Sequence, residues 1–213
     1  MMAVETPPTE PVRRRWSEVR EIVAVFLLAV TAILTAWCGF ESSKWGGMMS
    51  IQFSQASGAR IQSVDYASAS RDAQSVDLSI YTEWLLATAR GDVALADYVS
   101  ARFSPAFAVA FEDWQDNGQE LRSPFAEPSY VPAGRDEAVA ASERADEKFD
   151  AALVSNQRGD NYSILTVLFA MVLFFTAMSQ RSKSEFAGWF LLGLGLVVAI
   201  GGSVILATFP VLI

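Results

Sequence analysis

Three apolar stretches without a charged residue stand out along the chain, at residues 22–40, 162–179 and 186–209. Each is close to the roughly 20 residues that an α-helix needs to cross the hydrocarbon core of a bilayer. Between the first two stretches, no strand-like alternation of apolar and polar positions is sustained. The pattern predicts an all-α protein with three transmembrane helices. It also predicts an all-helical domain whose long helices are continuous with, or close to, the first and second spans.

The basic residues near the spans indicate which side of the membrane each segment occupies. They are Arg13, Arg14, Arg15 and Arg20 before the first span, and Arg181 and Lys183 in the short loop 180–185. Short segments rich in Lys and Arg stay in the cytoplasm. We therefore expect a multi-pass protein of the bacterial inner (cytoplasmic) membrane. Its cytoplasmic parts are the tail 1–21 and the loop 180–185, and its exported parts are the periplasmic domain 41–161 and the C-terminal end 210–213.

The first apolar stretch could instead be a cleaved signal peptide or a lipoprotein signal. It is long for a signal peptide, no clear small-x-small cleavage site follows it, and the bulky Trp37 stands directly before Cys38. We therefore interpret residues 22–40 as a retained membrane anchor.

Glycine and proline positions divide the expected exported domain into helices. Gly46-Gly47 suggests a bend, after which residues 48–90 contain no proline and predict one long helix. Gly91-Asp92 and Ser104-Pro105 each resemble a helix start, and they predict short helices at 93–103 and 105–116.

The second half of this domain is expected to return towards the membrane. Three prolines, at positions 124, 128 and 132, favour an extended segment, and a helix is predicted from residue 135 to residue 158. Gly159-Asp160 then suggests another cap before the second span.

Small residues recur at alternating spacings of four and three on the two long helices, which is typical of a helix-packing seam. On the outgoing helix the predicted seam includes Thr31, Thr35, Ala59, Ser63, Ala73 and Asp77. On the returning helix it includes Ala138, Ala145, Phe149, Ala152, Thr166 and Ala170. The third span has its own row of small residues at Gly195, Ala199 and Ser203. We expect an antiparallel helical hairpin, with coiled-coil character, against which the third span or a neighbouring subunit packs.

Two polar positions on the seam have competing interpretations. Thr31 and Thr35 could line a pore in an oligomer, or bond to their own helix or across the seam. Asp77 would need a partner such as Lys148 or Arg144, and we expect it to fix the register of the two helices.

Composition and charge exclude several classes of function. The chain has 213 residues, no histidine, one cysteine and a net charge of −8, and residues 41–161 alone carry a net charge of −9. It therefore lacks His-based catalysis, His-ligated metal sites and a disulfide framework, and it offers nucleic acid no basic surface. The acidic cluster Glu112, Asp113 and Asp116 fits a solvated helix face better than an ion site. We predict no catalytic, cofactor-binding or metal-ligating residue.

Several segments of the chain are similar to an uncharacterised family of bacterial inner-membrane proteins with three transmembrane helices and an exported helical domain. The similar segments are residues 35–46, 82–85, 89–92, 102–107, 123–125, 156–162, 168–170 and 173–175, with Pro128 and Tyr130. The resemblance implies a bacterial origin and this topology, and it supplies no catalytic residue.

These observations lead to one main functional expectation and two alternatives. We expect a non-enzymatic membrane protein, in contact with lipid, that acts as an oligomeric or accessory scaffold subunit through helix packing, with a second copy or another membrane protein as partner. The alternatives are an exported stimulus sensor that signals laterally to a partner, and a homo-oligomeric channel.

Overall fold

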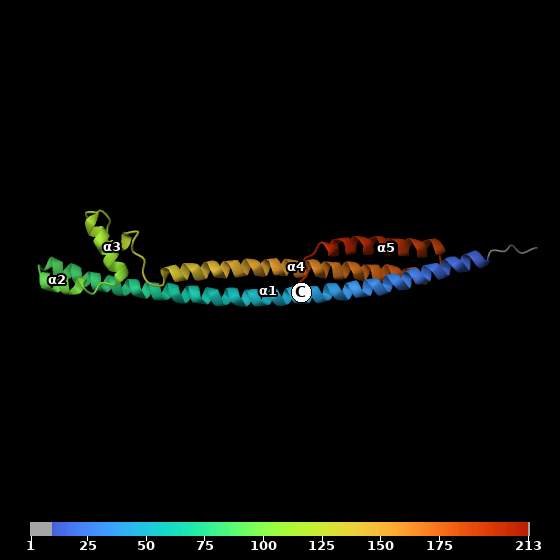
Figure 1. The fold of residues 1–213 in the computed structure, drawn as a ribbon, viewed down its shortest axis with the longest axis horizontal. Helices are drawn as coiled ribbons and strands as arrows, with labels where there is room; N and C mark the ends of the chain where they lie inside the picture. The colour runs from blue at the N-terminus through green and yellow to red at the C-terminus, as the bar shows by residue number, and fades with distance from the viewer. Residues whose placement is uncertain (1–9, 213) are drawn as a thin grey trace, which may run out of the picture. The chain divides into compact units, whose positions relative to one another are not determined.

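The computed structural model describes residues 10–212, and within them it contains helices and no strand. The helices are α1 (Glu10–Ala89), α2 (Val93–Ser100), α3 (Pro105–Asp116), the short 3₁₀ helix η1 (Pro124–Ala126), α4 (Arg135–Arg181) and α5 (Glu185–Ala207) (Figure 1). The predicted all-α fold is confirmed. The first residues of the expected cytoplasmic tail, 1–9, lie outside the described residues.

Three of these helices, α1, α4 and α5, are long and apolar enough to cross a membrane. They contain the three apolar stretches that the sequence pattern identified. The chain is therefore a membrane protein with three candidate spans.

The long helices are more continuous than the glycines suggested. Gly46 and Gly47 lie inside α1, and Gly159 lies inside α4, so the expected bend and the expected cap before the second span are wrong. Gly159 faces the other helix, since a Cβ there would lie 3.5 Å from the carbonyl oxygen of Ser42, an ordinary contact distance. The glycine therefore lies in a helix–helix contact and does not end a helix.

The predicted caps around the short helices are confirmed. Asp92 accepts a hydrogen bond from the backbone N–H of Leu95 at the start of α2, and Ser104 accepts one from Phe107 at the start of α3. Gly91 adopts a φ of +73°, which lets the chain turn directly after α1. Helix α2 ends at Ser100, three residues before the predicted boundary, because residues 101–103 form a turn.

The described chain forms two compact units. We call residues 10–51 and 151–212 the membrane unit, and residues 52–150 the hairpin unit.

In the membrane unit, parts of α1 and α4 pack with α5 around an apolar core. The buried residues of this core are Ala24, Leu27, Cys38, Trp45, Tyr162, Leu165, Phe169, Val172, Leu192 and Ala199. Most of the other large apolar side chains of these helices point outward, as expected for helices surrounded by lipid.

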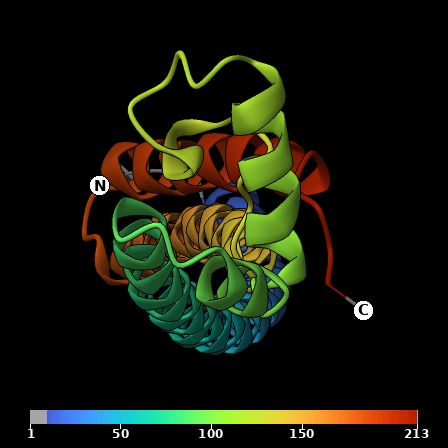
Figure 2. The ribbon, with the colours of Figure 1, turned by 90° about the vertical axis from the view of Figure 1, so that its left-hand side faces the viewer.

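In the hairpin unit, α1 and α4 run side by side, and α3 and the loop after it lie against the end of α1 (Figure 2). Residues of α1, α3 and this loop form a cluster of aromatic rings. Tyr81 is at its centre, with ring centroids of Phe107 and Phe125 at 5.6 and 5.7 Å. Trp114 donates from Nε1 to the carbonyl oxygen of Leu121 at 2.7 Å. This cluster holds the loop in place against α1 and α3.

Candidate functional site

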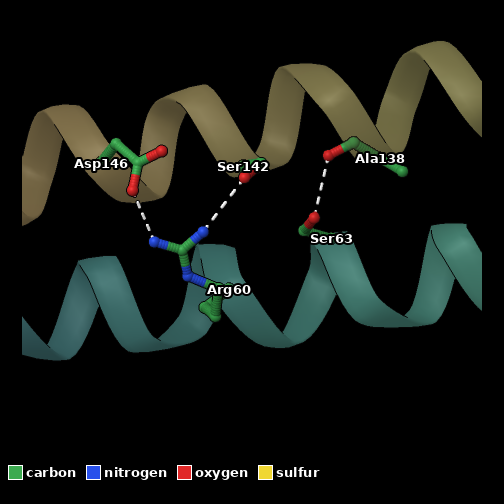
Figure 3. Close-up of polar contacts among 5 residues, drawn as sticks. All are labelled: Arg60, Ser63, Ala138, Ser142 and Asp146. Carbon is green, nitrogen blue, oxygen red and sulfur yellow. Dashed lines mark hydrogen bonds and ion pairs between the residues drawn. The ribbon is translucent and has the colours of Figure 1, made fainter.

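The contact between α1 and α4 in the hairpin unit uses small residues and a few polar bonds. Ser63 donates to the carbonyl oxygen of Ala138 at 2.9 Å (Figure 3). Ala59, Ala73 and Ala138 are half-buried and Ala145 is buried. The structure therefore brings Ser63 and Ala138 together, and the burial of Ala59 and Ala145 fits a close approach of the two helix backbones. Ala73 lies beyond this contact, because the residue just before α4, Gly134, already meets Tyr66 and Ser70.

One exposed ion pair also joins the two helices. Arg60 on α1 contacts Asp146 on α4 and donates to Ser142 at 3.0 Å (Figure 3). Because both side chains of this pair are exposed, it adds little stability and serves mainly to favour one register of the helices.

Asp77 has a different partner from those that the sequence suggested. Its side chain is 3% exposed, and its Oδ2 accepts a hydrogen bond of 2.9 Å from the hydroxyl of Tyr130. Lys148 and Arg144 do not bond to it. The correction has a simple cause, because the proline-rich loop folds back onto α1 and delivers Tyr130 to a position that helix periodicity cannot reveal.

Two predicted seam residues on α4 are exposed. Phe149 is 46% exposed, although its ring packs edge-to-face with that of Phe53 on α1, at a centroid distance of 5.4 Å. Ala170 is also exposed. Both belong to a row in which every residue is exposed, namely Phe149, Asn156, Ser163, Ala170 and Ala177.

The packed row lies one residue earlier along the helix. Its members are Ala141, Lys148, Ser155, Tyr162, Phe169 and Thr176, all of which are buried except the half-buried Lys148. Core positions of a coiled coil alternate spacings of three and four, so both rows fit the repeat and spacing alone does not choose between them. The sequence pattern predicts the small Ala170 as the packed residue, because small residues are typical of helix contacts in membranes. In the structure the larger Phe169 is the packed residue, and it lies in the core of the membrane unit.

The seam residues of the membrane unit are otherwise on packed faces. Ala152 on α4 and Thr31 on α1 are buried. Thr35 and Thr166 are half-buried, and each bonds to its own helix, at the carbonyl oxygens of Thr31 and Tyr162. These bonds match the local alternative that the sequence left open for Thr35.

Helix α5 approaches α4 through glycines. A Cβ at Gly195 would lie 3.2 Å from the hydroxyl of Thr176, and one at Gly202 would lie 2.7 Å from the side chain of Leu168. Gly195 and Ala199 are buried, and Ser203 is half-buried with its hydroxyl bonded to the carbonyl oxygen of Ala199. The predicted small-residue row of α5 therefore contributes to the inner packing of the unit.

An open apolar groove of about 440 Å³ lies between α1 and α5 in the membrane unit. Helix α1 contributes residues between Val23 and Leu34, and α5 contributes residues between Leu196 and Ala207. At 1.5 Å per residue the groove follows each helix for roughly 17 Å, about half of the hydrocarbon thickness.

The groove contains one unusual polar atom. Thr31, which lines it, is fully buried, and within residues 10–212 its hydroxyl has no hydrogen-bond partner. The hydroxyls of Thr35, Thr166, Thr176 and Ser203 all bond to a carbonyl of their own helix. This face of the membrane unit is the candidate functional site.

One buried carboxylate, directly after the first apolar stretch, was not predicted from the sequence. Glu41 is 0% exposed, and its Oε2 accepts a hydrogen bond of 3.0 Å from the backbone N–H of Leu212. Its Oε1 is buried and has no partner among the described residues. The signal was present, because Glu41 follows the buried Cys38 by three residues and precedes the buried Trp45 by four.

Comparisons with known proteins identify neither a family nor a function for the chain. No family model, curated protein or solved structure matches the chain.

Proposed function

We propose that the chain is a non-enzymatic protein of the bacterial inner membrane that works by assembling through its membrane helices, with a second copy of itself seated on the groove between α1 and α5. The observation that carries the proposal is the groove itself, an apolar hollow at a position where the rest of the unit is closely packed. In lipid, helices associate because close packing and polar contacts are better than contact with acyl chains. An unfilled hollow on a spanning helix therefore favours a helical partner that fits it.

Helix α5 carries an exposed glycine three residues before the first of its groove-lining residues. Gly193 is exposed, a Cβ on it would meet nothing within 4 Å, and it lies on the same side of α5 as the lining residues Leu196 and Ile200. Nothing inside the subunit requires a glycine at this position. A neighbouring helix that approaches closely would require it.

A second copy suits this face because the rim of the groove carries its own projecting side chains. Phe26 and Ile200 line the groove and are largely exposed. In a dimer with two-fold symmetry the same patch faces itself, so the projections of one copy can enter the hollow of the other. Each copy thus provides both the groove and the side chains that fill it.

Disulfide cross-linking in native membranes tests this arrangement. In a Cys38→Ala background, Ile200→Cys places one thiol on the groove, and Val167→Cys places one on an exposed position of α4. We expect mild oxidation to give a covalent dimer with Ile200→Cys and little dimer with Val167→Cys. Equal yields from the two variants would contradict the proposal.

A second variant separates a protein partner from lipid as the occupant. Gly193→Leu fills open space, so it should leave the thermal stability of the single subunit unchanged while weakening the dimer measured by native mass spectrometry from lipid nanodiscs. Gly39→Leu is the matched control, because its Cβ would also meet nothing within 4 Å. A protein that is monomeric in nanodiscs, with acyl chains alone on the groove, would overturn the proposal.

A further inference from the structure

A second hollow lies in the hairpin unit, and its lining is polar. It has a volume of about 680 Å³, within the range of small-molecule sites, and lies between α1, the proline-rich loop and the start of α4. Ser70 and Gln74 line it from α1, Glu127 and Tyr130 from the loop, and Arg135 from α4. Nothing in the packing of the helices requires this combination of side chains.

Glu127 is the unusual residue of this pocket. Its side chain is only 6% exposed, and its Oε1 is buried without a hydrogen-bond partner in the described part of the chain. A buried carboxyl oxygen that lacks a hydrogen-bond partner is destabilising. The protein therefore leaves the carboxylate of Glu127 only partly satisfied, at the wall of the pocket.

Arg135 gives the pocket a charge of the opposite sign. It lines the same hollow, yet it forms no ion pair with Glu127, and its bond to the protein is a long one, 3.4 Å from Nη1 to the carbonyl oxygen of Tyr130. The pocket therefore holds a carboxylate and a guanidinium that do not neutralise each other directly. A ligand between them can bond to both.

The walls of the pocket are fixed before any ligand arrives. Tyr130 is held by its bond to Asp77, and Phe125 stacks on Phe107 with ring centroids 4.7 Å apart. At the end of the loop, Gly134 has a φ of +90°, and a Cβ on it would lie 2.8 Å from the carbonyl oxygen of Tyr66. The chain passes so close to α1 that only glycine fits there, so little ordering is needed for binding.

We propose that this pocket binds a small zwitterion, a free α-amino acid, with its ammonium group on Glu127 and its carboxylate on Arg135. A simple amine or metal cation would face the like charge of Arg135, and a simple carboxylate or phosphate would face that of Glu127. A molecule that carries both charges satisfies both side chains. Arg is also well suited to a carboxylate, because its planar group can donate two parallel hydrogen bonds.

Binding can be measured on the full chain in lipid nanodiscs by isothermal titration calorimetry with each of the common L-amino acids. We expect at least one to bind with a Kd below about 1 mM. For that amino acid, the analogue without the amino group and the analogue without the carboxylate should each bind at least about tenfold more weakly, because each leaves one charged group unpaired. An amine that binds as well as the amino acid would overturn the proposal, and so would the absence of binding by the whole panel.

Variants of the two charged residues locate the binding. Glu127→Gln and Arg135→Gln should each raise the Kd at least about tenfold. Glu137→Gln and Arg144→Gln, at exposed positions of α4 that do not line the pocket, should leave it unchanged. Circular dichroism melting checks that each variant is folded. Binding that persists unchanged in folded Glu127→Gln and Arg135→Gln would show that the pocket is not the site.

Discussion

Three buried carboxylates of this molecule differ in how completely they are hydrogen-bonded. Asp77 has a hydroxyl donor from Tyr130, Glu41 has one backbone donor and one oxygen without a partner, and Glu127 has a buried oxygen without a partner among residues 10–212. A carboxylate with a donor stabilises a particular arrangement of the chain. A buried carboxylate without a donor lowers stability. Asp77 therefore has a structural role, whereas the incomplete pairing of Glu127 is consistent with a binding role for the pocket beside it.

The contact between Tyr130 and Asp77 predicts a dependence of stability on alkaline pH. Burial, and then the hydrogen bond and negative charge of Asp77, raise the pKa of Tyr130 above its ordinary value. An unfolded tyrosine ionises near pH 10, whereas the folded one keeps its proton to higher pH. The stability that this proton provides is therefore complete below about pH 10 and is lost as the pH rises above it.

Thermal unfolding of the protein in detergent, followed from about pH 8 to about pH 11, measures this effect. Tyr130→Phe removes the ionising group, so the variant should be less stable at neutral pH and should lose less stability above pH 10 than the wild type. Burial also raises the pKa of Tyr81, and that contribution remains in the variant. Parallel pH profiles for the two proteins would contradict the prediction.

At the scale of the helices, two adjacent glycines of α5 have opposite surroundings. A Cβ at Gly202 would lie 2.7 Å from Leu168 and 3.0 Å from the ring of Phe169, whereas one at Gly201 would meet nothing within 4 Å. We predict that Gly202→Ala lowers the free energy of unfolding by about 1–3 kcal/mol, because it overpacks the contact of α5 with α4. Gly201→Ala should be neutral or slightly stabilising, since alanine favours a helix.

Parallel thermal melts of the two variants in the same detergent test this prediction. A lower melting temperature for Gly202→Ala alone is the expected result. Equal melting temperatures would mean that α5 does not approach α4 as closely as the structure shows.

The helices and their spans could be predicted from the sequence because each depends on a local property. Apolar length marks the spans, and Asp92 and Ser104 mark helix starts through bonds to residues three positions away. Gly159 was misinterpreted because a glycine at a close helix contact and a glycine at a helix end look alike in one dimension. The contact with Ser42 that distinguishes them spans 117 residues of sequence.

The candidate sites could be predicted only in part, for the same reason. The small residues on the packed faces repeat along one helix, so periodicity finds many of them. Glu127 and Arg135 meet only because a loop with prolines at 128 and 132 folds against α1. No spacing along the chain encodes that fold.

For the molecule as a whole, the distribution of charge predicts on which side of the membrane the hairpin unit lies. Arg181 and Lys183 follow the second apolar stretch, and the acidic hairpin unit precedes it, so the hairpin unit should be exported. We predict that Ser75→Cys in the hairpin unit reacts with a membrane-impermeant maleimide in intact spheroplasts. Ser184→Cys, just before α5, should react only after lysis.

Both positions are exposed in the structure, so a difference in labelling reports the side of the membrane and not burial. The reverse pattern would invert the topology. It would also place the pocket of the hairpin unit in contact with cytoplasmic solutes.

The bond between Glu41 and Leu212 sets an order of events while the protein is being made. The two residues are 171 positions apart, which corresponds to about 9 to 34 seconds of translation at 5–20 residues per second. During that interval the carboxylate cannot accept a hydrogen bond from Leu212. Glu41 therefore gains this donor only after nearly the whole chain has been made, and a chain cut short before residue 212 would leave the carboxylate without it.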